Sequence, residues 1–436
     1  MPKPITLGLF GLGNIGSGLV SLLRERKKAI EDSAGLSISI KTICVKHPDK
    51  PRDSSLDLGG IKVTDNPLDI FKDPEIDIIV ELMGGVEPAS DILIQALEHK
   101  KPVVTANKAA LAANGDRIFA AASFHKVGIF FEAAVCGAIP IIRILQESLA
   151  SDCIQSLYGI VNGTTNYILT KMTLDNKDYD SALKEAQKLG FAEPDPTFDV
   201  NGNDAAQKLS ILASLGFRCR FTEKDVCTEG ISSIQKKDIL YADRLGYRIK
   251  LLGSGKRCQG VENMVSLRVS PTLIPKQHLL SGVLNELNAI FLVGKFVGEQ
   301  MYYGKGAGKY PTAATVLSDI IFAGQHSPET PFLFRSPFIG ANQVQDPLDE
   351  VSRFYLRFIV IDRPGVLAKI AGALGSHGVS IASFTQEERS TSGPVPIVLT
   401  THEVAGRQLQ HAIKEIESLD VVKEKAVSIR IEDFSN

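Results

Sequence analysis

A short acidic loop and the helix after it hold the first residues whose types and spacing could do chemistry. In FAEPDPTFDVNGNDAAQKLSILASLG, four acidic residues lie between Glu193 and Asp204, and Lys208 follows Asp204 by four positions. Residues at this spacing share one helix face, so Asp204 and Lys208 would lie side by side. A solvated salt bridge is the ordinary role of such a pair. Because the rest of this helix is apolar and small, a buried pair with a functional role is favoured.

A second lysine, Lys108, opens a predicted helix directly after the strand-like segment VVTAN. A cation at a helix N-terminus is unfavourable with the helix dipole, which indicates another role for this side chain. A functional role is therefore considered for Lys108 as well as for Lys208.

A glycine motif near the N-terminus predicts a dinucleotide-binding turn. Gly11, Gly13 and Gly16 form G-x-G-x-x-G between a strand-like segment (5–10) and a helical one. In such a turn the first glycine permits the tight bend, the second lets the backbone approach a pyrophosphate, and the third lets helix and strand pack closely. The free N–H groups at the helix N-terminus would hold the anion. An ordinary glycine-rich turn is the alternative.

The residues after the second predicted strand (36–45) bear on the choice of cofactor. An acidic residue usually stands there when the ribose 2′-hydroxyl is bound. Here the positions are occupied by Lys46, His47, Lys50 and Arg52. Cations suit a 2′-phosphate, so NADPH is predicted, with NADH as the other option. A solvated basic loop without a role in binding is the alternative.

The elements that must position these residues fall into three groups. Strands alternate with helices up to about residue 135, which predicts an α/β fold with a Rossmann-type, doubly wound parallel sheet. An α+β substrate and dimerisation domain and a C-terminal βαββαβ unit are predicted to follow it. We place the boundaries as follows: Rossmann domain 1–135 with about 304–326, substrate domain 136–303, linker 327–353, and C-terminal domain 354–436.

Composition excludes several classes of protein. The chain has 436 residues and a formal net charge of -2, which argues against a broad nucleic-acid-binding surface. There is no membrane-length apolar run and no N-terminal leader pattern, so we expect a cytoplasmic protein without membrane association. The six cysteines form no C-x-x-C and no zinc spacing with histidine, so reduced thiols are expected, including a structural Cys136.

Six segments, taken together and in this order, resemble the homoserine dehydrogenase family in its single-function form with a C-terminal ACT domain. They are ELMGGVEPA (81–89), TANKAALA (105–112), EAAVCGAIPII (132–142), GIVNGTTNYIL (159–169), GFAEPDPTFDVNGNDAAQKLSILA (190–213) and GKGAGKYPTAATV (304–316). The resemblance covers essentially the whole chain. It implies NAD(P)-dependent interconversion of L-aspartate 4-semialdehyde and L-homoserine, in the route to threonine and methionine.

The resemblance also implies roles at the substrate. Reduction of an aldehyde needs a hydride donor, a proton donor at the developing alkoxide and a clamp for the rest of the substrate. By resemblance, Lys208 is the proposed proton donor and Asp204 a substrate contact that orients it. Lys108 would lie between nicotinamide and substrate, which makes it a second candidate, and the sequence does not rank the two lysines. Glu193 matches the carboxylate that holds the substrate amino group. Three residues of NGTTNY are candidates for the substrate carboxylate, with a plain threonine N-cap as the equal alternative; they are Gly163, Thr164 and Thr165.

Cofactor and cation contacts are implied in the same way. Besides the three glycines, Lys46 and Lys108, the implied cofactor contacts are Leu12, Asn14, Ile15, Cys44, Met83, Gly84 and Gly306. EAAVCGAI resembles the family's monovalent-cation site, for an ion such as Na⁺. Its ligands would be the carboxylate of Glu132 and the backbone carbonyls of Val135, Gly137 and Ile139. A structural loop between two domains is the other interpretation.

The segment DRPGVLAKIAGALGSHGVSIASF (362–384) resembles an ACT domain, a regulatory module of amino acid metabolism. ACT modules commonly pair and bind an amino acid, so L-threonine is the expected effector and a homodimer or homotetramer the expected assembly. An oligomerisation unit without a ligand is the alternative. Two rival functions stay open: a semialdehyde-oxidising dehydrogenase with a cysteine nucleophile, and an inactive nucleotide-binding amino acid sensor.

Overall fold

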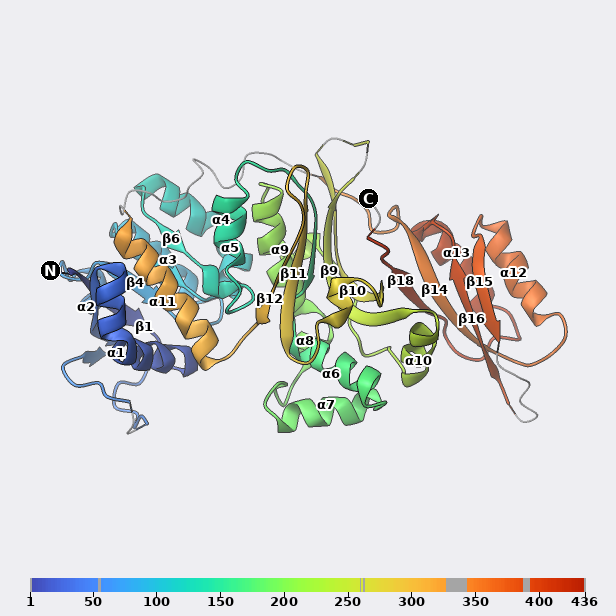
Figure 1. Cartoon of the computed structure of the whole chain (residues 1–436), viewed down its shortest axis with the longest axis horizontal. Coiled ribbons are helices and arrows are strands. Elements are labelled where there is room, and N and C mark those ends of the chain that lie inside the picture. The colour runs from blue at the N-terminus through green and yellow to red at the C-terminus, as the bar shows by residue number, and fades with distance from the viewer. Residues whose placement is uncertain are drawn as a thin grey trace. The chain divides into compact units, whose positions relative to one another are not determined.

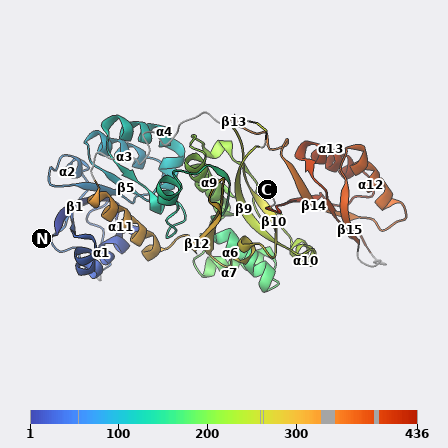
Figure 2. The ribbon, with the colours of Figure 1, turned by 45° about the horizontal axis from the view of Figure 1, so that its top comes forward.

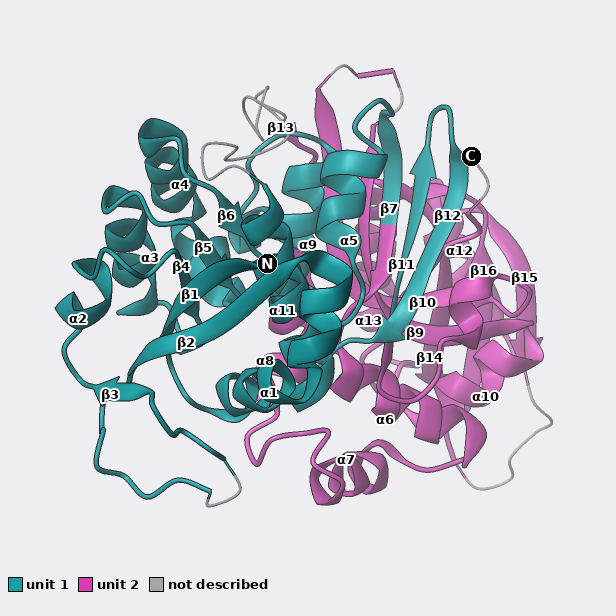
Figure 3. Cartoon of the chain, turned by 60° about the vertical axis from the view of Figure 1, so that its left-hand side comes forward, with its two compact units in different colours: residues 1–157, 207–225, 288–341 teal, residues 158–206, 226–287, 342–436 magenta. Residues whose placement is uncertain are grey.

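The computed structural model describes residues 2–53, 56–258, 260–261, 263–326, 343–386 and 393–434. The chain divides into two compact units, each built from three separate stretches (Figure 3). Unit 1 comprises residues 1–157, 207–225 and 288–341, and unit 2 comprises residues 158–206, 226–287 and 342–436. Strand β7 (Ile154–Ile160) and helix α9 (Asn203–Gly216) each contain a point where the chain passes from one unit to the other.

Within the described residues, unit 1 is built on a six-stranded parallel sheet with the order β3-β2-β1-β4-β5-β6. Its strands are β1 (Lys3–Phe10), β2 (Leu36–Cys44), β3 (Lys62–Thr64), β4 (Ile78–Glu81), β5 (Val103–Thr105) and β6 (Ile129–Phe130). Helices connect them: α1 (Asn14–Ala34), α2 (Leu68–Phe71), α3 (Ala89–Glu98) and α4 (Lys108–His125). The strand order reverses between β1 and β4, which confirms the predicted doubly wound sheet.

Helices cover both faces of this sheet (Figure 1). Helix α1 packs with α11 (Lys309–Gln325) on one face, and α3 packs with α4 on the other. The core between the sheet and the α1–α11 pair is apolar; its fully buried members include Leu7, Leu9, Leu19, Ile43 and Ile320. Alternating apolar strands and amphipathic helices bury such a core without leaving strand faces exposed.

The last part of unit 1 differs from the sequence expectation in two places. The strand expected over 127–135 is limited to β6 and is followed by the 3-10 turn Glu132–Ala134. The helix expected over 139–150 is short, α5 (Ile141–Arg143), and continues as the π-helical turn Ile144–Ser148. Unit 1 also contains β11 (Leu287–Gly294), which begins at the unit boundary, β12 (Gly298–Lys305) and the 3-10 turn Glu223–Asp225.

Unit 2 contains a mixed sheet in which β9, β10, β18, β14, β16 and β15 are neighbours in that order. The strands are β9 (Tyr247–Arg257), β10 (Met264–Pro275), β14 (Val351–Val360), β15 (Ile381–Gln386), β16 (Val395–Thr401) and β18 (Val427–Ile431). Shorter pieces pair at the sheet: β8 (Cys227–Thr228), β13 (Gln343–Val344) and β17 (Val404–Ala405). The helices are α6 (Gly163–Leu174), α7 (Tyr179–Lys188), α8 (Thr197–Val200), α10 (Lys236–Arg244), α12 (Val366–Ser376) and α13 (Gly406–Glu417), with the 3-10 turn Leu279–Gly282.

The predicted C-terminal βαββαβ arrangement is confirmed. Its elements follow in the order β14, α12, β15, β16, α13 and β18, and α12 and α13 pack together over one face of its strands (Figure 2). Gly365, which precedes α12, has a φ of 90°, a conformation that favours glycine. Because Thr272 of β10 lies beside Arg430 of β18 in parallel register, the sheet of this module continues the preceding sheet of unit 2.

A buried ion pair fixes α10 to the other face of the same strands. The guanidinium of Arg357 donates to Asp238 through Nε at 2.6 Å and Nη2 at 3.1 Å, and the hydroxyl of Tyr355 donates to Asp238 at 3.1 Å. Asp238 also accepts from the backbone N–H of Gln235, which completes a capping box at the start of α10. Breaking such a pair costs much stability, because removal of one partner leaves a buried charge unpaired.

The predicted linker, 327–353, is described only in part. Residues 327–342 lie outside the described residues, and the remainder contains β13 and the first residues of β14. Among the helices in the described ranges, none combines the length and the apolar character that a membrane crossing requires.

Candidate active site

The glycine turn in unit 1 has the geometry of a dinucleotide-binding turn. Gly11 has a φ of +93°, and a Cβ there would lie 2.7 Å from the carbonyl oxygen of Leu82. A Cβ on Gly16 would lie 2.5 Å from the carbonyl oxygen of Gly11, whereas a Cβ on Gly13 would meet no atom within 4 Å. Gly11 and Gly16 are therefore required by close packing, and the space at Gly13 fits a phosphate that approaches the start of α1.

The end of β2 borders this turn. The carbonyl of Cys44 accepts a hydrogen bond from the N–H of Gly11 at 3.0 Å, and burial raises the pKa of the Cys44 thiol to about 11. Lys46 lies exposed directly beyond the strand. Arg52 is occupied otherwise: its guanidinium donates to the carbonyl oxygens of His47, Pro48 and Lys50, at 3.0, 2.7 and 2.7 Å. Arg52 thus shapes the basic loop, and Lys46 lies nearer to the glycine turn along the chain.

Met83 and Gly84 lie in the turn after β4, on the same edge of the sheet as the glycine turn. Gly84 has a φ of +78°, and Met83 is 40% exposed. Two residues beyond the neighbouring strand β5, Asn107 caps α4 by accepting a hydrogen bond from the N–H of Ala110 at 3.1 Å, so that Lys108 is the first residue of this helix. The carboxyl ends of β4 and β5 therefore bring the predicted cofactor residues and Lys108 to one edge.

The helix that begins at Lys108 packs against α9, which carries Lys208. Leu111, Ile211 and Ser214 line one small cavity between these helices within unit 1. Helix α4 is kinked at Asn114, and Arg220 donates there to the carbonyl oxygens of Leu111 and Ala112 at 3.2 and 2.9 Å. The guanidinium replaces hydrogen bonds that the kink removes and so stabilises the first half of α4.

Two of the predicted substrate residues of unit 2, Asp204 and Thr165, bond to one asparagine, Asn162. Its amide group donates to Asp199 at 2.7 Å and to Asp204 at 2.9 Å, and its carbonyl oxygen accepts from the N–H of Thr165 at 2.8 Å. Thr164 donates to the second oxygen of Asp199 at 2.9 Å. Asp204 is only 6% exposed. The structure thus holds a buried aspartate in place through a neutral amide, one helical turn before Lys208 on α9.

This cluster corrects one sequence expectation about NGTTNY. The cap of α6 is the side chain of Asn162, so the plain threonine N-cap is wrong. The N–H of Thr165 is bonded within the cap, and the single hydroxyl proton of Thr164 is shared between Asp199 and the carbonyl of Phe191, which lies at 2.6 Å. At Gly163 a Cβ would lie 2.8 Å from the carbonyl oxygen of Glu286, so this position needs glycine.

Glu193 lies on the exposed loop between α7 and α8. The side-chain amide of Gln187 donates to the backbone carbonyls of Glu193 and Pro194, both at 3.2 Å. Asp195 accepts hydrogen bonds from Thr197, and the bonds from Thr197 lower the pKa of Asp195. The loop is therefore shaped by turn contacts, which leave the Glu193 side chain exposed.

The buried Lys250 holds α6 in place through hydrogen bonds. Lys250 on β9 is 2% exposed and donates to the side chain of Asn166 at 2.9 Å and to the carbonyl of Val283. Asn166 in turn donates to the carbonyls of Val283 and Leu287, at 3.2 and 3.0 Å. Desolvation is the main cause that lowers the pKa of Lys250 to about 7. Lys250 thus ties α6 to the segment 283–287 that borders Gly163.

Glu132, at the start of the predicted cation loop, is one of two neighbouring buried carboxylates; the other is Asp319 of α11. Glu132 accepts from the N–H groups of Ile142 and Arg143 at 2.6 and 2.9 Å, and Asp319 accepts from the N–H of Glu132 at 2.9 Å. Burial raises the pKa of Glu132; burial and then Glu132 raise that of Asp319 to about 8. Arg143, whose Nε lies 3.3 Å from Glu132, brings one positive charge to the two acids. The Glu132 carboxylate offers oxygen ligands of the kind that a monovalent cation prefers.

The other proposed cation ligands lie on the following loop, which packs tightly against the segment before α11. A Cβ on Gly137 would lie 2.6 Å from the carbonyl oxygen of Gly306, and a Cβ on Gly306 would overlap the side chain of Asn288. Val135 is fully buried, and the carbonyl of Ile139 accepts from Ile141 at 2.8 Å. Gly306 is thus required by packing against Asn288. The buried Oδ1 of Asn288 has no hydrogen-bond partner among the described residues.

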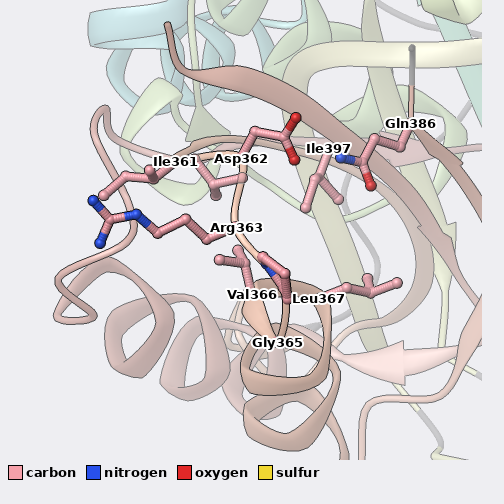
Figure 4. Close-up of a pocket in the computed structure, with 10 residues that line it drawn as sticks. Ile361, Asp362, Arg363, Gly365, Val366, Leu367, Gln386 and Ile397 are labelled. Carbon is pink, nitrogen blue, oxygen red and sulfur yellow. The ribbon is translucent and has the colours of Figure 1, made fainter. Parts of the chain in front are cut away.

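The C-terminal module has a cavity of about 440 Å³ at the turn between β14 and α12 (Figure 4). Asp362, Gly365, Leu367 and Gln386 are among its lining residues. Arg363 extends away from Gln386 in this view. A carboxylate group beside the free start of a helix could receive both charged groups of an amino acid.

Three polar residues that the sequence reasoning missed hold these regions together. They are Asp199, Asn162 and Glu81, and no role is predicted for them from the sequence. Asn162 alone carried a signal, because asparagine before a helical segment predicts a cap. Contacts of Asp199 with Asn162 and Thr164 join residues far apart in the chain, which no local pattern indicates.

Comparisons with known proteins agree with one another. Family models match for the NAD binding domain of homoserine dehydrogenase (residues 11–132), for homoserine dehydrogenase (140–321) and for the ACT domain (354–421). The chain is 44% identical to a homoserine dehydrogenase of Synechocystis sp., over 98% of this chain and 99% of that protein. The structure of a homoserine dehydrogenase from Thiobacillus denitrificans is similar with a TM-score of 0.92 and 42% identity, covering 99% of each chain. A hyperthermophilic archaeal homoserine dehydrogenase in complex with NADPH is similar with a TM-score of 0.63 and 25% identity, over 76% of this chain and 100% of that chain.

Proposed function

The chain belongs to the homoserine dehydrogenase family, and from this premise we propose how its own residues carry out the reaction. The enzyme interconverts L-aspartate 4-semialdehyde and L-homoserine with a nicotinamide cofactor. When bound, the reduced cofactor supplies a hydride to the aldehyde carbon. The protein must hold both reactants, exclude water and deliver one proton to the carbonyl oxygen as it becomes an alkoxide.

Lys208 is the proposed proton donor, with Lys108 as the competing candidate. Asp204 contacts the substrate and orients the lysine one turn further along α9. The buried contact between Asn162 and Asp204, at 2.9 Å, is the observation that carries this assignment, since it holds a carboxylate in one direction without neutralising it. A surface salt bridge would need neither burial nor such a partner.

The amino acid end of the substrate is assigned to the opposite side of the same cluster. Glu193 is exposed and suits the substrate ammonium group. The backbone N–H groups of Gly163 and Thr164, at the start of α6, suit the carboxylate. Thr165 supports this site from within the cap, because its own N–H donates to Asn162.

One assay tests the activity and separates the rival functions. We expect NADP⁺ reduction, followed by absorbance, when L-homoserine is added to the full chain. A semialdehyde-oxidising enzyme would instead need a thiol and an acyl acceptor, and thiol reagents would abolish its activity. An inactive sensor would bind the nucleotide and give no turnover, and this result would refute the assignment.

NADPH is the proposed preferred cofactor. Support comes from the exposed Lys46 at the end of β2 and from the archaeal relative solved with NADPH. We expect Lys46→Glu to lower kcat/KM for NADPH about tenfold or more and to spare NADH, because the new carboxylate repels a 2′-phosphate. Lys62→Glu, an exposed change on β3, is the control for net charge. A wild-type preference for NADH would contradict the proposal.

A monovalent cation such as Na⁺ is proposed at Glu132 and the carbonyls of Val135, Gly137 and Ile139. The buried carboxylate of Glu132 supports it, because hard cations prefer oxygen ligands. Thermal unfolding in buffers with Na⁺, K⁺ or a bulky organic cation at equal ionic strength is the measurement. We expect a higher midpoint with the ion that binds, because a ligand of the folded state stabilises it.

L-threonine is the proposed effector at the cavity of the C-terminal module. Because β18 pairs with β10 and Arg357 pairs with Asp238, removal of this module would expose residues of the rest of unit 2. Full-length Asp362→Ala and Gln386→Ala are therefore the better test. We expect both to weaken inhibition by threonine while activity without threonine persists. A wild type that threonine neither inhibits nor stabilises would leave the module as an assembly unit of a homodimer or homotetramer.

A further inference from the structure

Glu81, the last residue of β4, is a fully buried carboxylate to which the proposed function gives no role. It lies at the carboxyl edge of the sheet, beside the point between β1 and β4 where the strand order reverses. Ligands of doubly wound sheets bind outside this edge. A buried carboxylate is costly unless hydrogen bonds compensate it, so its donors show which segments it holds.

Three donors, from three segments, meet this one group. One oxygen of Glu81 accepts from the N–H of Met83 at 2.7 Å and from the side-chain amide of Asn107 at 3.4 Å. The other accepts from the hydroxyl of Thr105 at 2.6 Å. These donors are uncharged and come from the turn after β4, the end of β5 and the cap of α4. Glu81 therefore joins segments that are separate in sequence.

The turn after β4 forms one side of this arrangement. The bond from Met83 closes the turn over Glu81, while the N–H of Leu82 donates to the carbonyl of Phe10 at 2.8 Å. The carbonyl of Leu82 is the atom that a Cβ on Gly11 would meet at 2.7 Å. The turn held by Glu81 is thus packed directly on the glycine turn.

The start of α4 forms the other side. The amide of Asn107 donates to Gly85 at 2.9 Å as well as to Glu81, and its carbonyl oxygen accepts from Ala110 at 3.1 Å. The backbone N–H of Asn107 donates to the hydroxyl of Thr105 at 3.0 Å. The side chain that caps α4 is therefore itself oriented by Glu81, and Lys108 follows it in the chain.

We propose that Glu81 is a positioning residue for the reaction. One buried carboxylate holds the 82–85 turn and the Lys108 end of α4 in a fixed relation across the carboxyl edge of the sheet. This inference rests on the proposed roles of Met83, Gly84 and Lys108, through which Glu81 acts. Replacement of Glu81 should consequently lower both the affinity for the cofactor and kcat. Replacement of a purely structural carboxylate would lower only the stability of the fold.

The test compares Glu81→Ala, Glu81→Gln and Asp77→Ala in the full chain, by fluorescence titration with NADPH and by steady-state kinetics. Asp77 is a matched control: it precedes the same strand, is exposed, and accepts from the N–H of Thr6 at 2.7 Å. We expect Glu81→Ala to weaken NADPH binding and to lower kcat, each by at least about tenfold, because three donors lose their acceptor. Glu81→Gln, which keeps an acceptor oxygen, should recover most of both, and Asp77→Ala should match the wild type.

Thr105→Val provides a milder variant should Glu81→Ala fail to fold, since it removes one donor; about threefold weaker NADPH binding is expected. A folded Glu81→Ala with NADPH affinity and kcat within about twofold of the wild type would overturn the proposal. Equal losses in Asp77→Ala, or an unaltered Thr105→Val when Glu81→Ala is unfolded, would overturn it too. A wild-type chain that binds no NADPH would refute the proposed cofactor site itself, which separates that failure from failure of the role of Glu81.

Discussion

The glycine turn of unit 1 and the Asn162 cluster of unit 2 are built by opposite means. At the glycine turn the backbone makes the site, and side chains are excluded by contacts as close as 2.5 Å. At the Asn162 cluster two carboxylates, an amide and two threonines hold one another through side-chain hydrogen bonds. A backbone site tolerates no added atoms, whereas a side-chain site tolerates no lost partner. Substitutions that add or remove single groups should separate the two.

Replacement of the two candidate lysines is expected to have the largest effect on kcat. Lys108 follows the backbone-built edge of unit 1, and Lys208 follows Asp204 of the side-chain cluster. Replacement of the true proton donor by alanine should lower kcat by about 10²- to 10⁴-fold, the usual contribution of general acid catalysis. Steady-state kinetics of Lys208→Ala and Lys108→Ala will rank them. Lys224→Ala, at an exposed position in the 3-10 turn Glu223–Asp225, is the control. Normal kcat in both variants would exclude either lysine as the acid.

Asn162→Ala should weaken the side-chain cluster by about 2–3 kcal/mol in unfolding and raise KM for L-homoserine several-fold. Loss of a helix cap costs about 1 kcal/mol, and two aspartates lose a donor in addition. Asp178→Ala is matched to it, because Asp178 caps α7 through the N–H of Ser181 at an exposed site. That control should lose about 1 kcal/mol and keep its KM. Equal effects on KM would contradict the role of the cluster.

Lys250, behind the cluster, should make the stability of the protein depend on pH. Its pKa is about 7 in the folded chain against 10.5 ordinarily, so between these values the unfolded chain binds more protons. The free-energy cost of burying the charged Lys250 is fully present below about pH 7 and decreases as the pH rises. From pH 7 to 9 the wild type should gain about 2 kcal/mol relative to Lys250→Met. Urea unfolding at both values measures this, with the exposed Lys236→Met as control. A constant difference would refute it.

Gly13→Ala and Gly16→Ala should show opposite signatures. A methyl at Gly13 meets no protein atom, so the thermal midpoint should stay unchanged while NADPH binds about tenfold more weakly. A methyl at Gly16 meets the carbonyl of Gly11 at 2.5 Å and should cost about 1–3 kcal/mol of stability. Thermal melts with and without NADPH measure both. Reversal of the two signatures would contradict the backbone-built site.

The regions that sequence predicted best are those whose physics is local. The doubly wound sheet, the C-terminal βαββαβ unit and the family were all confirmed. The hydrophobic period of each segment and the left-handed conformation of Gly365 depend on neighbouring residues. Errors arose where one distant group decides the local structure. The strand expected over 127–135 ends early, where Asp319 accepts from the N–H of Glu132.

By itself the sequence determined the chemistry that the chain can offer: a nucleotide-binding turn, two candidate lysines, and an acidic segment before Asp204. The tertiary structure decided how these groups are held. Asn162 was assigned to Asp199 and Asp204, Glu81 to Asn107, and Arg357 to Asp238. The reason is physical: a buried polar group must find a partner, and that partner can come from any part of the chain that folding brings near. Residue types are written in the sequence, but their pairing is a property of the packed core.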